Sequence, residues 1–324
     1  MHHKLSLKDR RLLYELDVNS RQPLARLAKK LHMSKQVAAY RMNRLVRDGT
    51  IQKFLTIMDT SKLGFSTYKI FLRMQNLTKE KEMEVIEYLK NHPRVQWFAS
   101  TDGSYDMVFN ILAKNADELY EKLKEIDARY GDYIAEKHPA IMVLAEFYFR
   151  DYLVGKTAEV PKKRMYFGSN PRPVQIDNVN SKILSLLGND ARISNTDIAS
   201  AAEISPDTVR ERIKKLENAG IIQSYVLVLD NAKLGQMHYK VLFSLRNLSE
   251  KLERQLDGFF AMHPNIYFHN KGIGLFDAEI NLEVENEQQF REIMMLIKEK
   301  FSGIMKNYIV LNMYKIHKFN FYPM

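Results

Sequence analysis

The chain has 324 residues, of which 45% are hydrophobic and 27% are charged, a balance typical of a folded globular protein and not of a disordered one. It contains no cysteine, which excludes disulfides, thiolate metal ligands and a cysteine nucleophile. No apolar run approaches the roughly 18 residues of a membrane-spanning helix, and the first residues lack the apolar stretch of a secretion signal, so the expected location is the cytoplasm.

The net charge of +10 is concentrated at the start of the chain. Residues 1–60 carry 13 Lys/Arg against 5 Asp/Glu, a net charge of +8. Residues 151–173 carry 5 against 2, or +3, whereas residues 174–231 carry 6 against 8, or −2. Surplus cations can simply be solvated, but this concentration in one short segment favours a nucleic-acid partner.

The first elements predict a winged helix-turn-helix. Apolar spacing indicates a helix at 7–18 and a short helix at 24–31, and a third helix begins after Ser34 and ends before Gly49. A strand is expected at 51–58. Two short helices at a tight turn, followed by a strand, are typical of winged DNA-binding domains.

The next segment predicts a ferredoxin-like domain. Its expected elements alternate in the order βαββαβ: strand 67–75, helix 79–91, strands 95–101 and 105–113, helix 116–130 and strand 140–149. Asp102-Gly103 is a hairpin signal between the two middle strands. The following connector has proline, glycine and basic residues without periodicity, so it is predicted to be a linker.

The whole pattern then occurs a second time. Residues 5–140 align with 176–311 at a constant offset of 171 positions without a gap, so that Ser34 returns as Ser205. A period of this length indicates a tandem copy of a two-domain unit, not a solenoid repeat. The second copy ends in an expected strand at 308–319.

The predicted fold class is therefore α+β, with two winged helix-turn-helix domains alternating with two ferredoxin-like βαββαβ domains. The expected domains are 1–60 (DNA-binding), 61–150 (effector and dimerisation), 151–173 (basic linker), 174–231 (second DNA-binding) and 232–324 (second effector and dimerisation).

This ordered set resembles the leucine-responsive (Lrp/AsnC, feast/famine) family of transcription regulators. The run SPDTVRERIKKLENAGII of the second copy is close to that family's recognition-helix signature, and SKQVAAYRMNRLVRDGTI of the first copy is a looser match. The resemblance covers nearly the whole chain except the connector. It implies a sequence-specific regulator that binds double-stranded DNA and responds to a small amino acid, with no cofactor. The duplication departs from the family, whose usual member is a single unit that dimerises.

On the third helix of the first copy, helical spacing predicts that Val37, Arg41, Met42 and Leu45 face the domain core. Arg212 occupies the position equivalent to Arg41, so both arginines are expected to form structural ion pairs. The residues expected to contact DNA are Arg26, Lys29, Lys30, Ser34, Lys35, Gln36, Tyr40, Asn43, Arg44, Arg47 and Lys53 in the first copy, and Ser205, Arg210, Lys214 and Lys215 in the second.

The two copies are not expected to bind DNA equally. Arg26, Lys29 and Lys30 of the first copy correspond to Asp197, Ser200 and Ala201 of the second. Because neutralised phosphates supply much of the affinity for DNA, the first copy is expected to dominate binding, and a non-palindromic site follows.

A Gly-x-aromatic-Asp motif occurs once in each copy and resembles the effector motif of the family. Its residues, expected to hold an amino acid, are Gly103, Ser104, Tyr105 and Asp106, with Gly274, Phe276 and Asp277 in the second copy. The alternative is structural: the glycine permits the turn, and the aspartate accepts hydrogen bonds from nearby backbone N–H groups.

Two other functions are alternatives to a regulator. The first is an enzyme, since the same pair of domains occurs in sirohaem decarboxylases, which carry a His-x-Tyr-x-Arg arrangement that we do not find in this chain. The second is an interaction protein that no longer reads DNA, which the +8 charge of residues 1–60 disfavours. No catalytic residue and no metal site is predicted, because the histidines are scattered.

The duplication also predicts how the copies assemble. Each βαββαβ sheet has one face covered by helices, so its other face needs a partner. We expect the two open faces to pack against each other at roughly 10 Å. The chain would then be an intramolecular pseudo-dimer with both helix-turn-helix units on one side, and exchange of domains between two chains stays open as an alternative.

Overall fold

The computed structural model describes residues 5–155, 165–168 and 173–322, so most of the connector expected to be a basic linker lies outside the described residues. The first copy comprises α1 (Leu7–Val18), α2 (Leu24–Lys30), α3 (Lys35–Arg47), β1 (Ile51–Met58), η1 (Thr60–Leu63), β2 (Ser66–Met74), α4 (Lys79–Asn91), β3 (Val95–Gly103), β4 (Met107–Ala113), α5 (Ala116–Tyr130), η2 (Gly131–Tyr133) and β5 (Ile134–Phe147). The second comprises α6 (Asn178–Asn189), α7 (Asn195–Ala202), α8 (Pro206–Asn218), β7 (Ile222–Leu229), α9 (Asn231–Leu234), β8 (Met237–Leu245), α10 (Glu250–Met262), β9 (Ile266–Ile273), β10 (Ala278–Val284), α11 (Glu287–Phe301) and β11 (Met305–Phe319). The short elements η3 (Asp151–Val154) and β6 (Met165–Phe167) lie between them.

The expected order of helices and strands is confirmed in both copies, and the fold is α+β. In each helix-turn-helix unit, serine hydroxyls cap the helices as predicted: Ser34 accepts from Val37 N, and Ser205 from Thr208 N. In each ferredoxin-like unit, two helices cover one face of the sheet, α4 and α5 in the first and α10 and α11 in the second.

The two sheets join into one closed structure. The strand order is β2-β4-β3-β11-β8-β10-β9-β5-β6, and β5 also pairs with β2, so eight strands close into a barrel and β6 is added at β5. The open faces of both sheets form its interior. Our expectation of two separate sheets stacked face to face is therefore incomplete, because their edges are also hydrogen-bonded to each other at two junctions.

Strands β5 and β11 make those two junctions. The first part of β5 pairs with β2 of its own copy and its end pairs with β9 of the other copy. Strand β11 does the same with β8 and β3. The strand predicted at 140–149 thus begins earlier, at Ile134, and the one predicted at 308–319 begins at Met305, because each strand belongs to two sheets and needs extra length.

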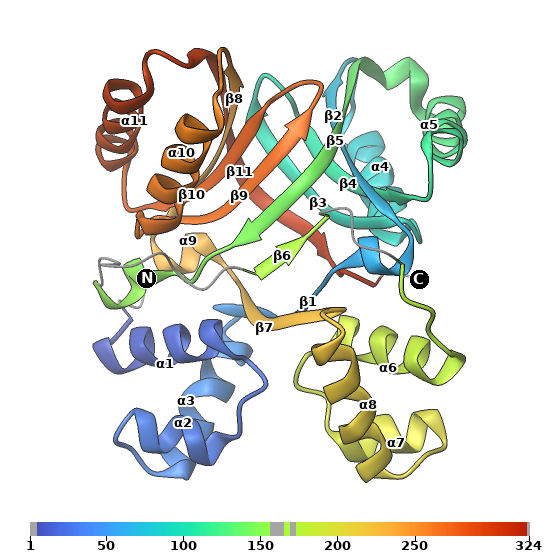
Figure 1. The fold of residues 1–324 in the computed structure, drawn as a ribbon, viewed down its shortest axis with the longest axis vertical. Helices are drawn as coiled ribbons and strands as arrows, with labels where there is room; N and C mark the ends of the chain where they lie inside the picture. Colours follow the sequence, from blue (N-terminus) through green and yellow to red (C-terminus); the bar gives the residue numbers. More distant parts are fainter. Residues whose placement is uncertain (1–4, 156–164, 169–172, 323–324) are drawn as a thin grey trace.

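Both helix-turn-helix units lie at the same end of the barrel (Figure 1). Strand β1 of the first unit pairs antiparallel with β7 of the second, and this two-stranded ribbon lies between the barrel and the helices. The first unit consequently lies below the second copy's barrel half, and the second unit below the first copy's half. The short strand β6, which was not expected in the connector, pairs with the end of β5.

Candidate nucleic-acid interface

Helix α3 presents a polar face to solvent. Ala38, Met42 and Leu45 are buried against the rest of the first unit. Six other side chains of α3 are exposed or partly exposed, namely Lys35, Gln36, Ala39, Tyr40, Asn43 and Arg47. Tyr40, at 65% exposure, is an uncovered aromatic ring on a recognition helix, where it can pack on a thymine methyl or a sugar.

The prediction for one residue of the inner face, Val37, is wrong. Val37 is 42% exposed, and Ala38 takes the buried position instead. At 100° per residue Ala38 lies within about 40° of Met42 and Leu45, so it shares their face of the helix, whereas Val37 lies to one side of that face.

Two arginines of α3 are bound to α1. Arg41 and Arg44 each contact the carboxylate of Asp9 at 2.8 Å. Asp9 is buried, but hydrogen bonds from Ser6, Arg41 and Arg44 outweigh burial and hold its pKa below the usual value. The ion pair expected for Arg41 is confirmed, whereas Arg44, expected to contact DNA, is engaged in fixing α3 on α1.

The ion pair expected for the equivalent arginine of the second copy, Arg212, is also confirmed. The Arg212 guanidinium lies 2.6 Å from Asp177 at the start of α6, as expected of a structural ion pair. The recognition helix of each unit is thus fixed on the first helix by an arginine at the same repeat position.

Helix α2 carries the cations expected to meet phosphates. Arg26 and Lys29 are exposed, and neither forms a hydrogen bond to another described side chain. Lys30 donates to Glu15 of α1, so part of its charge is neutralised within the unit. Arg26 and Lys29 are therefore the cations of α2 that stay exposed without such a partner among the described residues.

The second unit offers less positive charge. Helix α7, which corresponds to α2, contains no lysine or arginine. On α8, Arg210 is paired with Asp207 at 2.6 Å, while Lys214 and Lys215 are exposed. Ser205 serves as the N-cap of α8, so its hydroxyl is already used.

Lys53 is not on the DNA-binding face. Its Nζ donates to the carbonyl of Phe319 at the end of β11, 2.9 Å away. Burial lowers the pKa of Lys53 to about 8. The residue was expected to contact DNA because it lies in the wing strand, but β1 pairs with β7 and is enclosed between the units and the barrel instead of projecting as a free wing.

Two arginines that we did not predict clamp the units to each other. Arg21 donates to the carbonyls of Ala191 and Ile193, both at 2.7 Å, in the second unit. Arg192 donates to the carbonyls of Ser20 and Gln22 in the first. With the β1–β7 ladder, this reciprocal contact fixes the distance between the recognition helices. Arg21 and Arg192 are equivalent positions of the repeat, so identity across the copies was the signal that could have revealed them.

The first unit is also fixed to the barrel by a buried ionic network. Arg150 contacts Asp17 of α1 at 2.7 Å and Glu283 of β10 at 2.8 Å, and Tyr152 donates to Glu283. The Arg150 guanidinium lies 4.5 Å from the centre of the Tyr267 ring. At the position equivalent to Arg150 the second copy has Phe321, which is buried in an apolar cluster, so the two units are anchored by different chemistry.

The two Gly-x-aromatic-Asp turns are part of the junctions between the halves. A side chain at Gly103 would lie 2.9 Å from the carbonyl of Val310, and one at Gly274 would lie 3.0 Å from that of Pro139. Both glycines have positive φ, at 124° and 118°, which also favours glycine.

The other residues of these turns also have structural partners. The carboxylates of Asp106 and Asp277 accept hydrogen bonds from Met74 N and Leu245 N, each at 2.6 Å. Tyr105 and Phe276 are buried in the apolar cluster between the halves, and only Ser104 is exposed without a described contact. Within one chain this geometry favours the structural alternative over an amino-acid site.

Two kinds of feature are absent from the described part of the chain. The described residues contain no group of three or more His, Cys, Asp or Glu side chains that could hold a metal ion. None of the helices within the described ranges is long and apolar enough to cross a membrane.

Known proteins support the same assignment. A family model described as winged helix-turn-helix DNA-binding matches residues 5–52 and again 176–223. An HTH-type transcriptional regulator of Pyrococcus horikoshii is 35% identical over 123 residues, which are 36% of this chain and 82% of the relative. The regulator FL11 of the same organism is 30% identical over 111 residues, 34% of this chain and 72% of its own.

Among solved structures, the siroheme decarboxylase NirDL matches 97% of this chain and 93% of its own with a TM-score of 0.59. Its 12% identity makes this a likeness of fold alone, one that extends over both copies. The two sequence relatives, by contrast, are named HTH-type transcriptional regulators and are 35% and 30% identical. The chain belongs to the Lrp/AsnC family of helix-turn-helix transcription regulators and carries the family's unit twice.

Proposed function

We propose that this regulator binds DNA as a fixed pair of unequal helix-turn-helix units, in which the first unit supplies most of the affinity. The observation that carries the proposal is the distribution of exposed cations. Arg26, Lys29, Lys35 and Arg47 are exposed on α2 and α3, whereas α7 has no cation and α8 exposes Lys214 and Lys215 beside Arg210, which is paired with Asp207. Each neutralised phosphate strengthens binding by releasing counterions, so the first unit gains more from DNA.

The fixed pairing of the units supports a site of defined spacing. The β1–β7 ladder and the reciprocal contacts of Arg21 and Arg192 leave the recognition helices little freedom to move apart. Half-site spacing then follows from protein geometry, as in dimeric helix-turn-helix proteins. Because the exposed residues of α3 and α8 differ, we expect two half-sites of different sequence and hence a non-palindromic operator.

The test compares two charge-matched double variants on a DNA site selected from a random pool. Arg26→Ala/Lys29→Ala removes two exposed cations from the first unit, and Lys214→Ala/Lys215→Ala removes two from the second. If both cations of the first pair contact phosphates, the slope of log affinity against log salt falls by about 1.8. The second pair is expected to change slope and affinity less. Equal losses of DNA affinity in the two double variants would contradict the proposal that the first unit supplies most of the affinity.

The proposal assigns no catalytic role to the chain. The nearest runs to His-x-Tyr-x-Arg are Glu146–Tyr148–Arg150 and, at the same repeat position, His317–Phe319–Phe321, so neither copy has all three residues. Arg150 is also committed to Asp17 and Glu283. We expect the purified protein to show no visible absorption, and a bound tetrapyrrole in its spectrum would favour the enzyme instead.

A further inference from the structure

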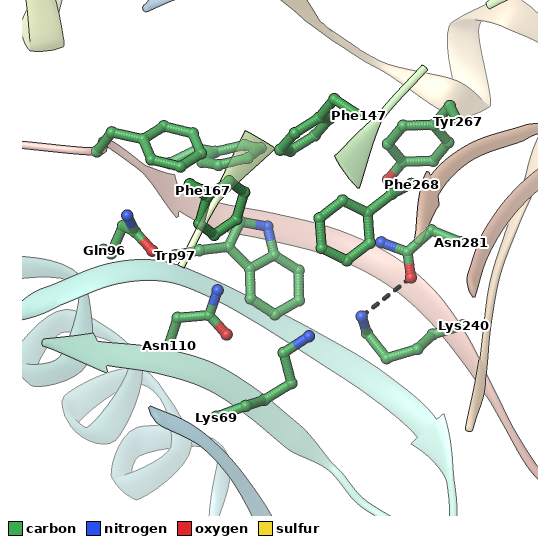
Figure 2. Close-up of a pocket in the computed structure, with 12 residues that line it drawn as sticks. Lys69, Gln96, Trp97, Asn110, Phe147, Phe167, Lys240, Tyr267, Phe268 and Asn281 are labelled. Atoms are coloured by element: carbon green, nitrogen blue, oxygen red, sulfur yellow. Dashed lines mark hydrogen bonds between the residues drawn. The ribbon is translucent and has the colours of Figure 1, made fainter. Parts of the chain in front are cut away.

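The barrel interior leaves little space for a ligand. Figure 2 shows Lys69 of β2 and Lys240 of β8 directed toward the ring of Trp97 on β3, with several phenylalanine rings above them. The space left between these side chains is about 20 Å³, which is about enough for one water molecule. A much larger space lies at the end of the second copy's sheet, where β8 and β9 begin and β10 ends.

This larger space is a pocket of about 220 Å³ that opens to solvent. A closed cavity of about 150 Å³ inside a protein can take up benzene, so a small organic molecule fits into this pocket. Both copies contribute to its lining. Tyr152 and Gly155 follow the last strand of the first copy, and the other described lining residues belong to the second copy, namely Gln236, Pro264, Asn265, Glu285 and Gln289.

In the first copy an arginine side chain lies in the equivalent place. The Arg94 guanidinium is 4.6 Å from the centre of the Phe65 ring, and it forms an ion pair of 3.2 Å with Glu118. At the position equivalent to Arg94 the second copy has Asn265. Because the asparagine side chain is shorter, it leaves open the volume that the arginine side chain takes in the first copy.

The backbone around these two residues is the same in both copies. Arg94 N and Asn265 N each donate to the ring of the histidine two residues earlier, at 3.1 and 3.2 Å. The carbonyl oxygens of the same two residues accept from Leu112 N and Glu283 N, at 2.9 and 3.0 Å. The pocket therefore results from the exchange of side chains, and the first copy shows that this place in the repeat accommodates a guanidinium group.

The pocket of the second copy offers a free acceptor and a negative charge. Gln236 is only 8% exposed, and its Oε1 has no hydrogen-bond partner. Glu118 of the first copy is replaced by Gln289, but Lys114 is replaced by Glu285, so the site keeps one carboxylate. Among the described lining residues Glu285 is the only charged one, and it is exposed. A buried acceptor without a donor and an unpaired carboxylate favour a ligand that is a cation with several N–H groups.

From these observations we infer that this pocket binds a small molecule with an alkylguanidinium group. The group donates to Gln236 Oε1 and pairs with Glu285, in the place that Arg94 takes in the first copy. A guanidinium carries its N–H donors in one plane and can serve both acceptors at once, whereas an ammonium is a compact point charge. Tyr152 supplies an aromatic side chain to the lining, and guanidinium groups pack well on aromatic rings. The inference goes beyond the proposed DNA binding and needs no DNA for its test.

The test is saturation-transfer NMR on the full chain, titrated with ethylguanidinium chloride. Ethylammonium chloride supplies the same charge without the planar set of donors, and N-ethylurea supplies the planar shape without the charge. Sodium chloride keeps the ionic strength equal in all titrations. We expect saturable binding of ethylguanidinium that is about tenfold tighter, or more, than the binding of either control. An absence of saturable binding, or a control compound that binds as tightly, overturns the inference.

Variants show whether the binding takes place in this pocket. Asn265→Arg gives the second copy the arginine of the first and should abolish binding, because the chain's own guanidinium then fills the pocket. Gln236→Leu removes the buried acceptor and should weaken binding by about tenfold or more. It also removes an unpaired polar atom from the interior, so the variant should keep its fold. Glu299→Gln, which removes an exposed carboxylate further along α11, should bind as the unmodified protein does.

Unchanged binding of ethylguanidinium in either folded pocket variant overturns the inference. If Asn265→Arg does not fold, Gln236→Leu decides the matter alone.

Discussion

The Arg150 network offers the sharpest test of how the copies are joined. Arg150→Met keeps an aliphatic side chain but removes the guanidinium, which lies over the Tyr267 ring and contacts Asp17 and Glu283. Both carboxylates are almost completely buried, so the variant leaves two acidic groups without their cation. Removing one partner of a buried ion pair typically costs about 3–5 kcal/mol, and we expect a loss of that order in the free energy of unfolding.

The loss should depend on pH in a defined direction. Burial raises the pKa of Glu283, but Arg150 and other partners hold it below its usual value. Without Arg150, the pKa of Glu283 should rise above its value in the unfolded chain, and that of Asp17, already raised by burial, should rise further. The folded variant then binds more protons than the unfolded variant, so its stability falls as pH increases through that window. The difference from the unmodified protein should therefore be smaller near pH 5 than near pH 7.

Urea unfolding at both pH values measures these effects, and two further variants control them. Arg254→Met removes an exposed ion pair with Glu250, whose side chains are 74% and 87% exposed, and should change stability little. The triple variant Arg150→Met/Asp17→Asn/Glu283→Gln removes the stranded charges and should recover part of the loss. The reasoning is refuted if Arg150→Met costs no more than Arg254→Met, or costs the same at pH 5 and pH 7.

Three other predictions concern the remaining contacts between elements. Arg21→Ala/Arg192→Ala should broaden the range of half-site spacings recovered from a random DNA pool, and an unchanged spacing would show that the β1–β7 ladder suffices alone. Asp106→Ala and Asp277→Ala should each lower the free energy of unfolding by about 0.5–1.5 kcal/mol, because each removes the acceptor of a backbone N–H, and undiminished stability would contradict that role. Burial lowers the pKa of His92 to about 4, below its unfolded value of about 6.5, so its contribution to stability should be lost as pH falls from 6.5 to 4, by up to roughly 3 kcal/mol. In His92→Asn, whose amide oxygen can still accept from Arg94 N, stability should depend less on pH across that range.

Much of the architecture could be predicted because helix caps and turns have local physical causes. The duplication shows each of these signals twice. Ser34 and Ser205 begin their helices by accepting a backbone N–H, and Gly49 and Gly220 follow the helix ends at positive φ. Such signals lie within a few residues of one another, so one sequence suffices to read them.

Features that depend on contacts between the copies could not be read in this way. Lys53 was placed on the DNA side because a wing strand normally projects there, and only the pairing of β1 with β7 turns it toward the barrel. Arg44 lies on the polar side of its helix, and only the position of α1 shows that Asp9 holds it. The closed barrel requires β5 and β11 each to pair with strands of both sheets. Pairing with a distant strand produces no local sequence pattern from which it could be predicted.

The duplication explains how the barrel interior can hold an unequal set of ionisable side chains. In a symmetric homodimer every interior position occurs twice, so a carboxylate would be present on both sides or on neither. Here the equivalent residues Lys69 and Lys240 both donate to Glu279, whereas the position equivalent to Glu279 in the first copy is Val108. The same freedom allows Arg150 to anchor one helix-turn-helix unit by ion pairs while Phe321 anchors the other by apolar packing. Residues that hold the two units together, such as Arg21 and Arg192, are identical in the two copies, whereas the residues proposed to bind DNA differ.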